Sequence, residues 1–226
     1  MIDIHREALG HFLEISDGDD ITFLPTSGGV NNVVYYVQRD NVITHVLRIY
    51  NNGNDDAKVI YEHSVLSQLA LQSFSFHLPQ TIPSLIEKKE FVRLSTGASA
   101  CLFKLIIGTL PKLTCVQEIG RVSGELNYAM SKVNLSQLPS KCPNPPYYDL
   151  YKVHHAVSRE SFLGKFESTA FDPWRAEADS ITSELCSIEK IINSHLNSPS
   201  SLPISLIHGD LHYDNVLCEG GKVTGS

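Results

Sequence analysis

The chain has 226 residues, of which 42% are apolar and 19% charged, and its 18 basic and 25 acidic side chains give a formal net charge of −7. This composition is typical of a globular protein with one hydrophobic core or two small lobes, and it excludes an array of domains. Basic residues form no cluster in either half, so we expect no nucleic-acid-binding surface made by bulk charge.

Targeting signals are not evident. The segment Met1–Glu7 lacks the basic-then-apolar profile of a signal peptide, and the most apolar stretch, 101–107, is short and contains Lys104. Five widely spaced cysteines without a Cys-x-x-Cys indicate reduced thiols. We therefore expect a cytoplasmic protein that neither spans nor binds a membrane.

The first part of the chain predicts a helix followed mainly by strands. Apolar residues at helical spacing favour a short helix over 3–15. Runs of β-branched and aromatic residues separated by turn residues then predict an antiparallel meander. Its strands are expected over 21–26, 33–38 and 42–50, followed by a helix over 55–72 and shorter strands over 84–87, 91–95 and 100–107.

One acidic residue lies on the apolar face of the predicted helix over 55–72. Val59, Glu62 and Leu66 follow one another at steps of three and four. A carboxylate on a buried face is costly unless it is paired, so the pattern requires a cation opposite Glu62. Arg48, near the end of the third strand, is the nearest candidate. In the alternative, Glu62 lies at the rim of the apolar stripe in water.

The remainder of the chain is predicted to be helical. Gly108-x-x-Pro111 ends the strands, and Thr114-x-x-Gln117 forms a capping box for the next helix. Further helices are expected over 151–166 and 173–196, the last with Asp172 as N-cap and an apolar stripe typical of core packing. The predicted organisation is a β-rich lobe over 1–107, a hinge over 108–113 and a helical lobe over 114–226.

The segment 204–218 carries the strongest chemical pattern, His208-x-Asp210-x4-Asn215, on a polar loop between two apolar strands. In phosphoryl transfer a carboxylate accepts the proton of the attacking hydroxyl, and an amide oxygen a few residues on can bind the Mg²⁺ that bridges the nucleotide phosphates. Asp210 is then the catalytic base, Asn215 the metal ligand and His208 the residue that holds the loop. The alternative is a loop in which Asp and Asn side chains only satisfy their own backbone.

A second candidate element lies between the first two strands. Ser27, Gly28 and Gly29 can bring bare backbone N–H groups against phosphate oxygens, although Gly-Gly pairs often serve only as turns. Arg48 and Glu62 follow, then the hinge and the Asp210/Asn215 loop. This order matches the parts of a kinase, in which a strand cation paired to a helix carboxylate contacts the α- and β-phosphates.

These motifs resemble the aminoglycoside phosphotransferase and choline kinase group of small-molecule kinases. The resemblance rests on 27–32, 46–50, Glu62 and above all on 208–217, and it covers the chain from about residue 21 to its end. It implies an α+β, protein-kinase-like bilobal fold with a β-rich N-lobe and an incomplete helical C-lobe. It also implies ATP and Mg²⁺ as cosubstrates. The γ-phosphoryl group would pass to a hydroxyl of an amino alcohol, homoserine-like or aminoglycoside-like acceptor.

Two departures from the family pattern affect this expectation. Leu126 is followed by Asn127 where the family usually has histidine. More seriously, the family's metal-binding Asp follows the hairpin after the catalytic loop, and this sequence ends at Ser226 before it. Without that carboxylate Mg²⁺ has only Asn215 at the site. We therefore expect weak nucleotide binding and little turnover from the 226-residue polypeptide.

Two other functions stay open at this point. His208, Asp210 and His212 alternate along one segment and could converge on a metal ion in a hydrolase. The chain could also be a non-catalytic nucleotide-binding fragment. The sequence specifies neither the acceptor nor the oligomeric state.

Overall fold

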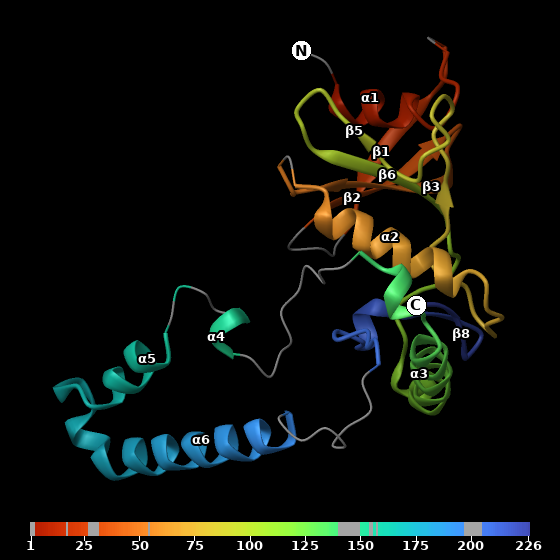
Figure 1. The fold of residues 1–226 in the computed structure, drawn as a ribbon. Coiled ribbons are helices and arrows are strands. Elements are labelled where there is room, and N and C mark those ends of the chain that lie inside the picture. The colour runs from red at the N-terminus through yellow and green to blue at the C-terminus, as the bar shows by residue number, and fades with distance from the viewer. Residues whose placement is uncertain are drawn as a thin grey trace. The chain divides into compact units, whose positions relative to one another are not determined.

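A computed structural model of the chain describes residues 3–16, 18–26, 32–53, 55–139, 150–153, 156, 158–196 and 205–226 (Figure 1). The chain divides into two compact units: Met1–Lys141 with Ser205–Ser226, and Cys142–Ile204. Because segments from both ends of the sequence meet in the first unit, the β-rich region and the candidate catalytic loop belong to one body. These units group residues that contact one another, whereas the predicted lobes are consecutive stretches of the sequence. The lobes and their hinge over 108–113 therefore stay predictions.

An antiparallel sheet forms the centre of the first unit, with strand order β1-β2-β3-β6-β4 and β5 paired to β6. Asp40 and Asn41, both at positive φ (51° and 62°), connect β2 and β3 as a two-residue turn that suits the right-handed twist of the strands. The meander predicted for the first three strands is confirmed. The strands are β1 (Ile21–Pro25), β2 (Asn32–Arg39), β3 (Val42–Tyr50), β4 (Thr81–Ile82), β5 (Val92–Arg93) and β6 (Ser99–Lys104).

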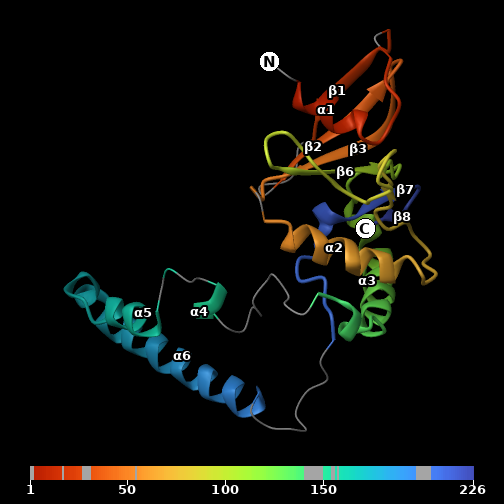
Figure 2. The ribbon, with the colours of Figure 1, turned by 45° about the horizontal axis from the view of Figure 1, so that its top comes forward.

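Two helices, α1 (Ile4–Gly10) and α2 (Ala57–Leu69), cover opposite faces of this sheet (Figures 1 and 2). Side chains alternate between the faces along each strand, so Leu47 packs with the buried residues of α1 whereas Tyr50 packs with those of α2. The Asp3 carboxylate caps α1 by accepting a hydrogen bond from the backbone N of His5 at 3.0 Å. The β-rich region therefore has a separate apolar cluster on each face.

A helix and a β-hairpin complete the first unit. The apolar side of α3 (Val116–Ser131) packs against the hairpin of β7 (Leu217–Glu219) and β8 (Lys222–Gly225) in a third apolar cluster. Thr109 and Cys218 exchange two backbone hydrogen bonds of 3.0 and 2.8 Å. The segment predicted as a hinge is thereby fastened to the hairpin. Short 3-10 helices are η1 (Leu113–Cys115), η2 (Leu135–Gln137) and η4 (Tyr213–Asn215).

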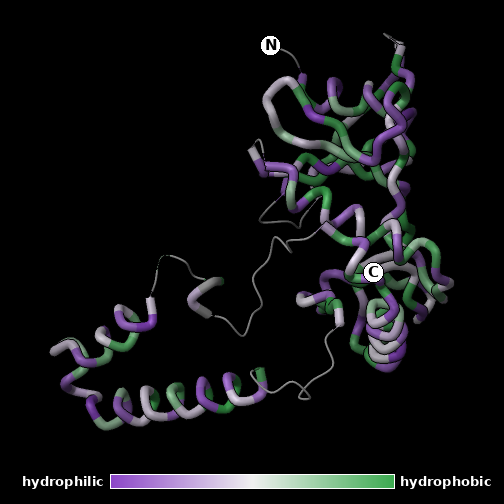
Figure 3. Tube along the Cα trace, viewed as in Figure 1, coloured by the Kyte–Doolittle hydropathy of each residue, from purple (hydrophilic) through white to green (hydrophobic). Residues whose placement is uncertain are grey.

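The second unit is helical and consists of α4 (Leu150–Val153), α5 (Arg159–Phe166), η3 (Thr169–Trp174) and α6 (Arg175–Leu196). An ion pair of 2.9 Å between Arg159 and Glu189 joins α5 to α6. The apolar stripe predicted as core is exposed along much of α6, where only Ala178 is buried and Ile181 is 48% exposed. Figure 3 shows that hydrophobic positions recur along this helix. No helix in the described part of the chain is both long and apolar enough to cross a membrane.

Three predictions about strands and helix continuity are wrong. Residues 84–87 form a turn rather than a strand, and the short strand β4 precedes them. Residues 205–207, expected to continue a strand before the catalytic loop, have no regular structure. The helix expected over 151–166 is interrupted: α4 ends at Val153, and α5 begins only after Ser158, whose hydroxyl accepts from the backbone N of Ser161 in a capping box. Local hydroxyl hydrogen bonds of this kind start helices.

Both predicted helix caps are also wrong. Thr114 lies inside η1, and α3 begins at Val116 with Cys115 as its N-cap and without a side-chain cap. Asp172 and Pro173 lie inside η3, and the Asp172 carboxylate accepts a hydrogen bond from the Arg175 guanidinium at 2.6 Å instead of capping α6. In both places a preceding 3-10 turn already supplies the hydrogen bonds that the cap was expected to make.

Candidate functional site

Arg48 on β3 and Glu62 on α2 form the ion pair that the sequence required. One guanidinium nitrogen of Arg48 lies 2.5 Å from Oε1 of Glu62, and the two side chains are 27% and 36% exposed. Burial alone would lower the pKa of Arg48. The Glu62 carboxylate, together with smaller contributions, acts in the opposite direction, so the pKa lies above its ordinary value. The site therefore holds a permanent cation at the edge of the apolar cluster under α2.

A buried polar cluster lies next to this pair. The Tyr50 hydroxyl accepts a hydrogen bond from the Cys101 thiol at 3.5 Å and lies 3.3 Å from Nε2 of His63. The Arg48 guanidinium carbon lies 5.7 Å from the ring centre of Tyr50 and 5.0 Å from that of Phe103, within cation–π distance. Burial raises the pKa of Tyr50 above its ordinary value and that of Cys101 to about 12, so both groups stay neutral.

His63 makes folding stability dependent on pH. Burial lowers its pKa below the ordinary value near 6.5, although the carboxylates of Glu62 and Glu90 oppose the shift. As the pH falls, the His63 ring therefore binds its proton at a higher pH in the unfolded chain than in the folded chain. We expect the free energy of unfolding to be unaffected by His63 above pH ~6.5 and to decrease as the pH falls below it.

Urea unfolding between pH 7.5 and 5 tests this expectation. His63→Gln removes the titration, so the decrease at low pH should be smaller in this variant than in the unsubstituted chain. Parallel pH curves for the two proteins would contradict the expectation.

The Asp210/Asn215 loop brings its two polar residues together. The amide nitrogen of Asn215 donates to the backbone oxygen of Asp210 at 2.7 Å and to its carboxylate at 3.3 Å. This leaves the amide oxygen of Asn215 as the atom available to a cation. The carboxylate of Asp210 is 73% exposed and hence accessible to a substrate hydroxyl.

His208 contacts the same loop from within. Its Nδ1 accepts a hydrogen bond from the backbone N of Asp210 at 3.3 Å. Loss of hydration lowers the pKa of His208, with the Asp210 carboxylate acting in the opposite direction. A neutral ring is the form that can accept this hydrogen bond. This hydrogen bond suits the predicted role of His208 in holding the loop, and that role stays a proposal.

The sequence pattern indicates His212 as a possible metal ligand, and the structure gives it a different place. Its Nδ1 accepts from the backbone N of Asp214 at 3.3 Å and so caps η4, while its Nε2 lies 3.6 Å from the Asp210 carboxylate. Within the described residues no group of three His, Cys, Asp or Glu side chains could hold a metal ion. The geometry therefore gives no support to the hydrolase alternative.

The predicted phosphate loop cannot be placed. Ser27, Gly28 and Gly29 lie outside the described residues, so their contact with phosphate stays a prediction. The flanking strands β1 and β2 are described and pair directly, with Pro25 opposite Tyr35. The loop therefore connects adjacent strands, as expected.

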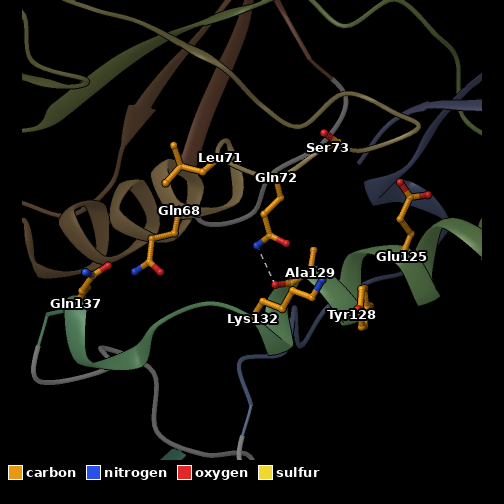
Figure 4. Close-up of a pocket in the computed structure, with 9 residues that line it drawn as sticks. All are labelled: Gln68, Leu71, Gln72, Ser73, Glu125, Tyr128, Ala129, Lys132 and Gln137. Atoms are coloured by element: carbon orange, nitrogen blue, oxygen red, sulfur yellow. Dashed lines mark hydrogen bonds between the residues drawn. The ribbon is translucent and has the colours of Figure 1, made fainter.

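A groove of about 500 Å³ lies apart from these residues, between α2 and α3 (Figure 4). Gln72 spans it by donating to the backbone oxygen of Ala129 at 3.0 Å. Its lining includes none of the candidate site residues Arg48, Glu62, Asp210 and Asn215. The lining residues are Gln68, Leu71, Gln72, Ser73, Glu125, Tyr128, Ala129, Lys132 and Gln137. The groove gives no indication of the site of chemistry.

Sequence reasoning missed Tyr50 and His63. Tyr50 follows Arg48 by two positions on one strand and therefore shares its face, and His63 is adjacent to Glu62 on the helix. The alternation of side chains along the strand was a signal that could have indicated Tyr50. His63 had no comparable signal, because a lone histidine in an apolar helix is typical of core packing.

Comparison with solved structures identifies the fold. A microcompartment-associated aminopropanol kinase matches 98% of this chain and 67% of its own length, with a TM-score of 0.62 and 17% identity. Amicoumacin kinase hAmiN, in complex with AMP-PNP, Ca²⁺ and Ami, gives 0.58 and 13%, over 96% and 60% of the two chains. Spectinomycin phosphotransferase, in complex with ADP and spectinomycin, gives 0.54 and 17%, over 90% and 61%. Neither a family model nor a curated protein matches the sequence.

The chain therefore has the protein-kinase-like bilobal fold found in small-molecule kinases and phosphotransferases, as the resemblance implied. It spans only about 60–67% of the length of these solved chains. At 13–17% identity the likeness shows the fold alone.

Proposed function

We propose that the chain is an ATP-dependent phosphotransferase that moves the γ-phosphoryl group to a hydroxyl of a small molecule. The observation that carries this proposal is the presence, in one compact unit of kinase-like fold, of the Arg48–Glu62 pair and the Asp210/Asn215 loop. The structural neighbours support it, because they are named as kinases or phosphotransferases, two of them in complex with AMP-PNP or ADP.

Each residue has a role set by its chemistry. Arg48, a permanent cation held by Glu62, would bind the oxygens of the α- and β-phosphates. The exposed carboxylate of Asp210 would orient the acceptor hydroxyl and accept its proton as the oxygen attacks the γ-phosphorus. His208 and Asn215 would hold Asp210 through hydrogen bonds to its backbone.

The donor atoms at this loop suit magnesium. The amide oxygen of Asn215 is a hard oxygen ligand of the kind that Mg²⁺ prefers, and Mg²⁺ in such sites also binds the substrate phosphates. Asn215 would be the ligand on this chain. When bound, Mg²⁺ supplies neutralisation of the charge on the transferring phosphates.

The acceptor is proposed only as a class. The neighbours are named as an aminopropanol kinase, an amicoumacin kinase and a spectinomycin phosphotransferase, which favours a small-molecule acceptor. Transfer of label from γ-³²P-ATP to a panel of amino alcohols, homoserine and aminoglycosides would identify it. Absence of both nucleotide binding and transfer would refute the proposed function and leave the fold unaffected.

Arg48→Gln is expected to weaken binding of ADP with Mg²⁺ by roughly 10- to 150-fold, since a hydrogen-bonded charge on the phosphates contributes about 1.5–3 kcal/mol. Titration calorimetry measures this directly. Arg39→Gln is the matched control, because Arg39 is also a strand arginine paired to a carboxylate, Asp19, at 2.8 Å. Equal effects of the two substitutions would contradict the role of Arg48.

A further inference from the structure

The residues around Arg48 all come from the face of the sheet that α2 covers. Arg48 lies opposite Cys101 in the β3–β6 register, Tyr50 follows two positions later on β3, and Phe103 follows Cys101 on β6. All four side chains therefore point to the same side. On α2, Glu62 and His63 face them across the apolar cluster of Tyr50, Val59 and Phe103.

This arrangement restrains the guanidinium group from more than one direction. Glu62 binds one of its nitrogens, while the rings of Tyr50 and Phe103 lie 5.7 and 5.0 Å from its central carbon. The Tyr50 ring is itself fixed, because it is only 5% exposed and its hydroxyl contacts both His63 and Cys101. His63 is fixed in turn by nearly parallel stacking on Phe103, with ring centres 6.3 Å apart.

A purely structural role explains this cluster poorly. Burying a tyrosine hydroxyl and an imidazole costs free energy even when they are paired, and phenylalanine or leucine would fill the same space without polar atoms. His63 also keeps a buried Nδ1 without a hydrogen-bond partner, 3.6 Å from the Glu90 carboxylate. The polar contacts that the cluster does make, from Tyr50 to His63 and Cys101, are the kind that fix side chains in one orientation.

We infer that Tyr50 and His63 are positioning residues that fix the orientation of the Arg48 guanidinium for a nucleotide phosphate. The Tyr50 ring lies beneath the cation, and the Tyr50–His63 contact ties the strand that carries Arg48 to the helix that carries Glu62. The inference rests on the proposed function only for the identity of the ligand. The ordering of Arg48 can be measured without any nucleotide.

The first experiment measures this ordering by NMR in the 226-residue chain. The Arg48 Nε–H signal is assigned by its loss in Arg48→Gln, and its hydrogen exchange is followed in Tyr50→Phe. We expect exchange about tenfold faster than in the unsubstituted chain, because the hydroxyl that fixes the ring is gone. Tyr35→Phe is the control, since Tyr35 lies on the opposite face of the sheet, against His5 and Phe23. Unchanged exchange in Tyr50→Phe would overturn the inference.

The second experiment is a double-mutant cycle on the affinity for ADP with Mg²⁺. Tyr50→Phe should weaken binding about threefold in the unsubstituted chain and have no effect in the Arg48→Gln background, because it acts through Arg48. His63→Gln, whose amide can still bond the Tyr50 hydroxyl, should retain most of the affinity, unlike His63→Ala. Equal effects of Tyr50→Phe in both backgrounds would indicate a merely structural role and overturn the inference. If the unsubstituted chain binds no ADP, the proposed function fails, and the exchange experiment still decides the role of Tyr50.

Discussion

Asp210→Asn is expected to lower the rate of phosphoryl transfer by about a thousandfold, because a positioned general base contributes roughly 10²–10⁴. The amide keeps the size of the side chain but cannot accept the proton of the acceptor hydroxyl. Since the Asp210 carboxylate is 73% exposed, the substitution should leave the unfolding temperature unchanged. Single-turnover transfer from γ-³²P-ATP to the acceptor measures the rate even when the chemistry is slow.

The neighbouring carboxylate provides the control for this experiment. Asp214 lies on the same loop and is 47% exposed, but its contact is with Nδ1 of His212 rather than with Asn215. Asp214→Asn changes the net charge by the same amount and should reduce the rate far less. If both substitutions reduced the rate equally, the charge of the loop would account for the effect and Asp210 would not be the base.

The parts of the site that follow a regular side-chain period could be predicted from the sequence. Steps of three and four along α2 placed Glu62 on the apolar face, where it required a cation, and Arg48 near the end of the third strand was the nearest candidate. The structure shows this ion pair. The contact between Asp210 and Asn215 is also local, because both lie on one short loop. Their roles in phosphoryl transfer stay proposals.

Features that depend on distant segments could not be predicted in this way. The strand expected over 84–87 had suitable β propensity, but it forms a turn while Thr81–Ile82 pairs with β6 instead. The cap expected at Thr114 failed because a 3-10 turn occupies that position. Likewise, nothing in the local sequence indicated that Gly108 would meet residues more than a hundred positions further along the chain.

Gly108→Ala is expected to destabilise the chain by about 1–3 kcal/mol, the usual penalty for overpacking a close contact. A Cβ at this position would lie 2.5 Å from Oγ1 of Thr224 and 2.9 Å from Cβ of Leu217, both on the β7–β8 hairpin. The hairpin would have to move away from the 106–109 segment, which would strain the backbone pair between Thr109 and Cys218. Urea unfolding measures the loss.

Two comparisons separate this steric contact from the general effect of replacing glycine. Gly120→Ala, inside α3, meets no atom within 4 Å and should stabilise the chain by up to about 1 kcal/mol, because alanine favours a helix. Thr224→Ala removes the nearest clashing atom, a buried hydroxyl oxygen without a hydrogen-bond partner, and should restore part of the stability lost in Gly108→Ala. Because the hairpin directly follows the Asp210/Asn215 loop, restored stability should be accompanied by restored transfer. Strictly additive effects of the two substitutions would show that the hairpin does not contact Gly108 in this way.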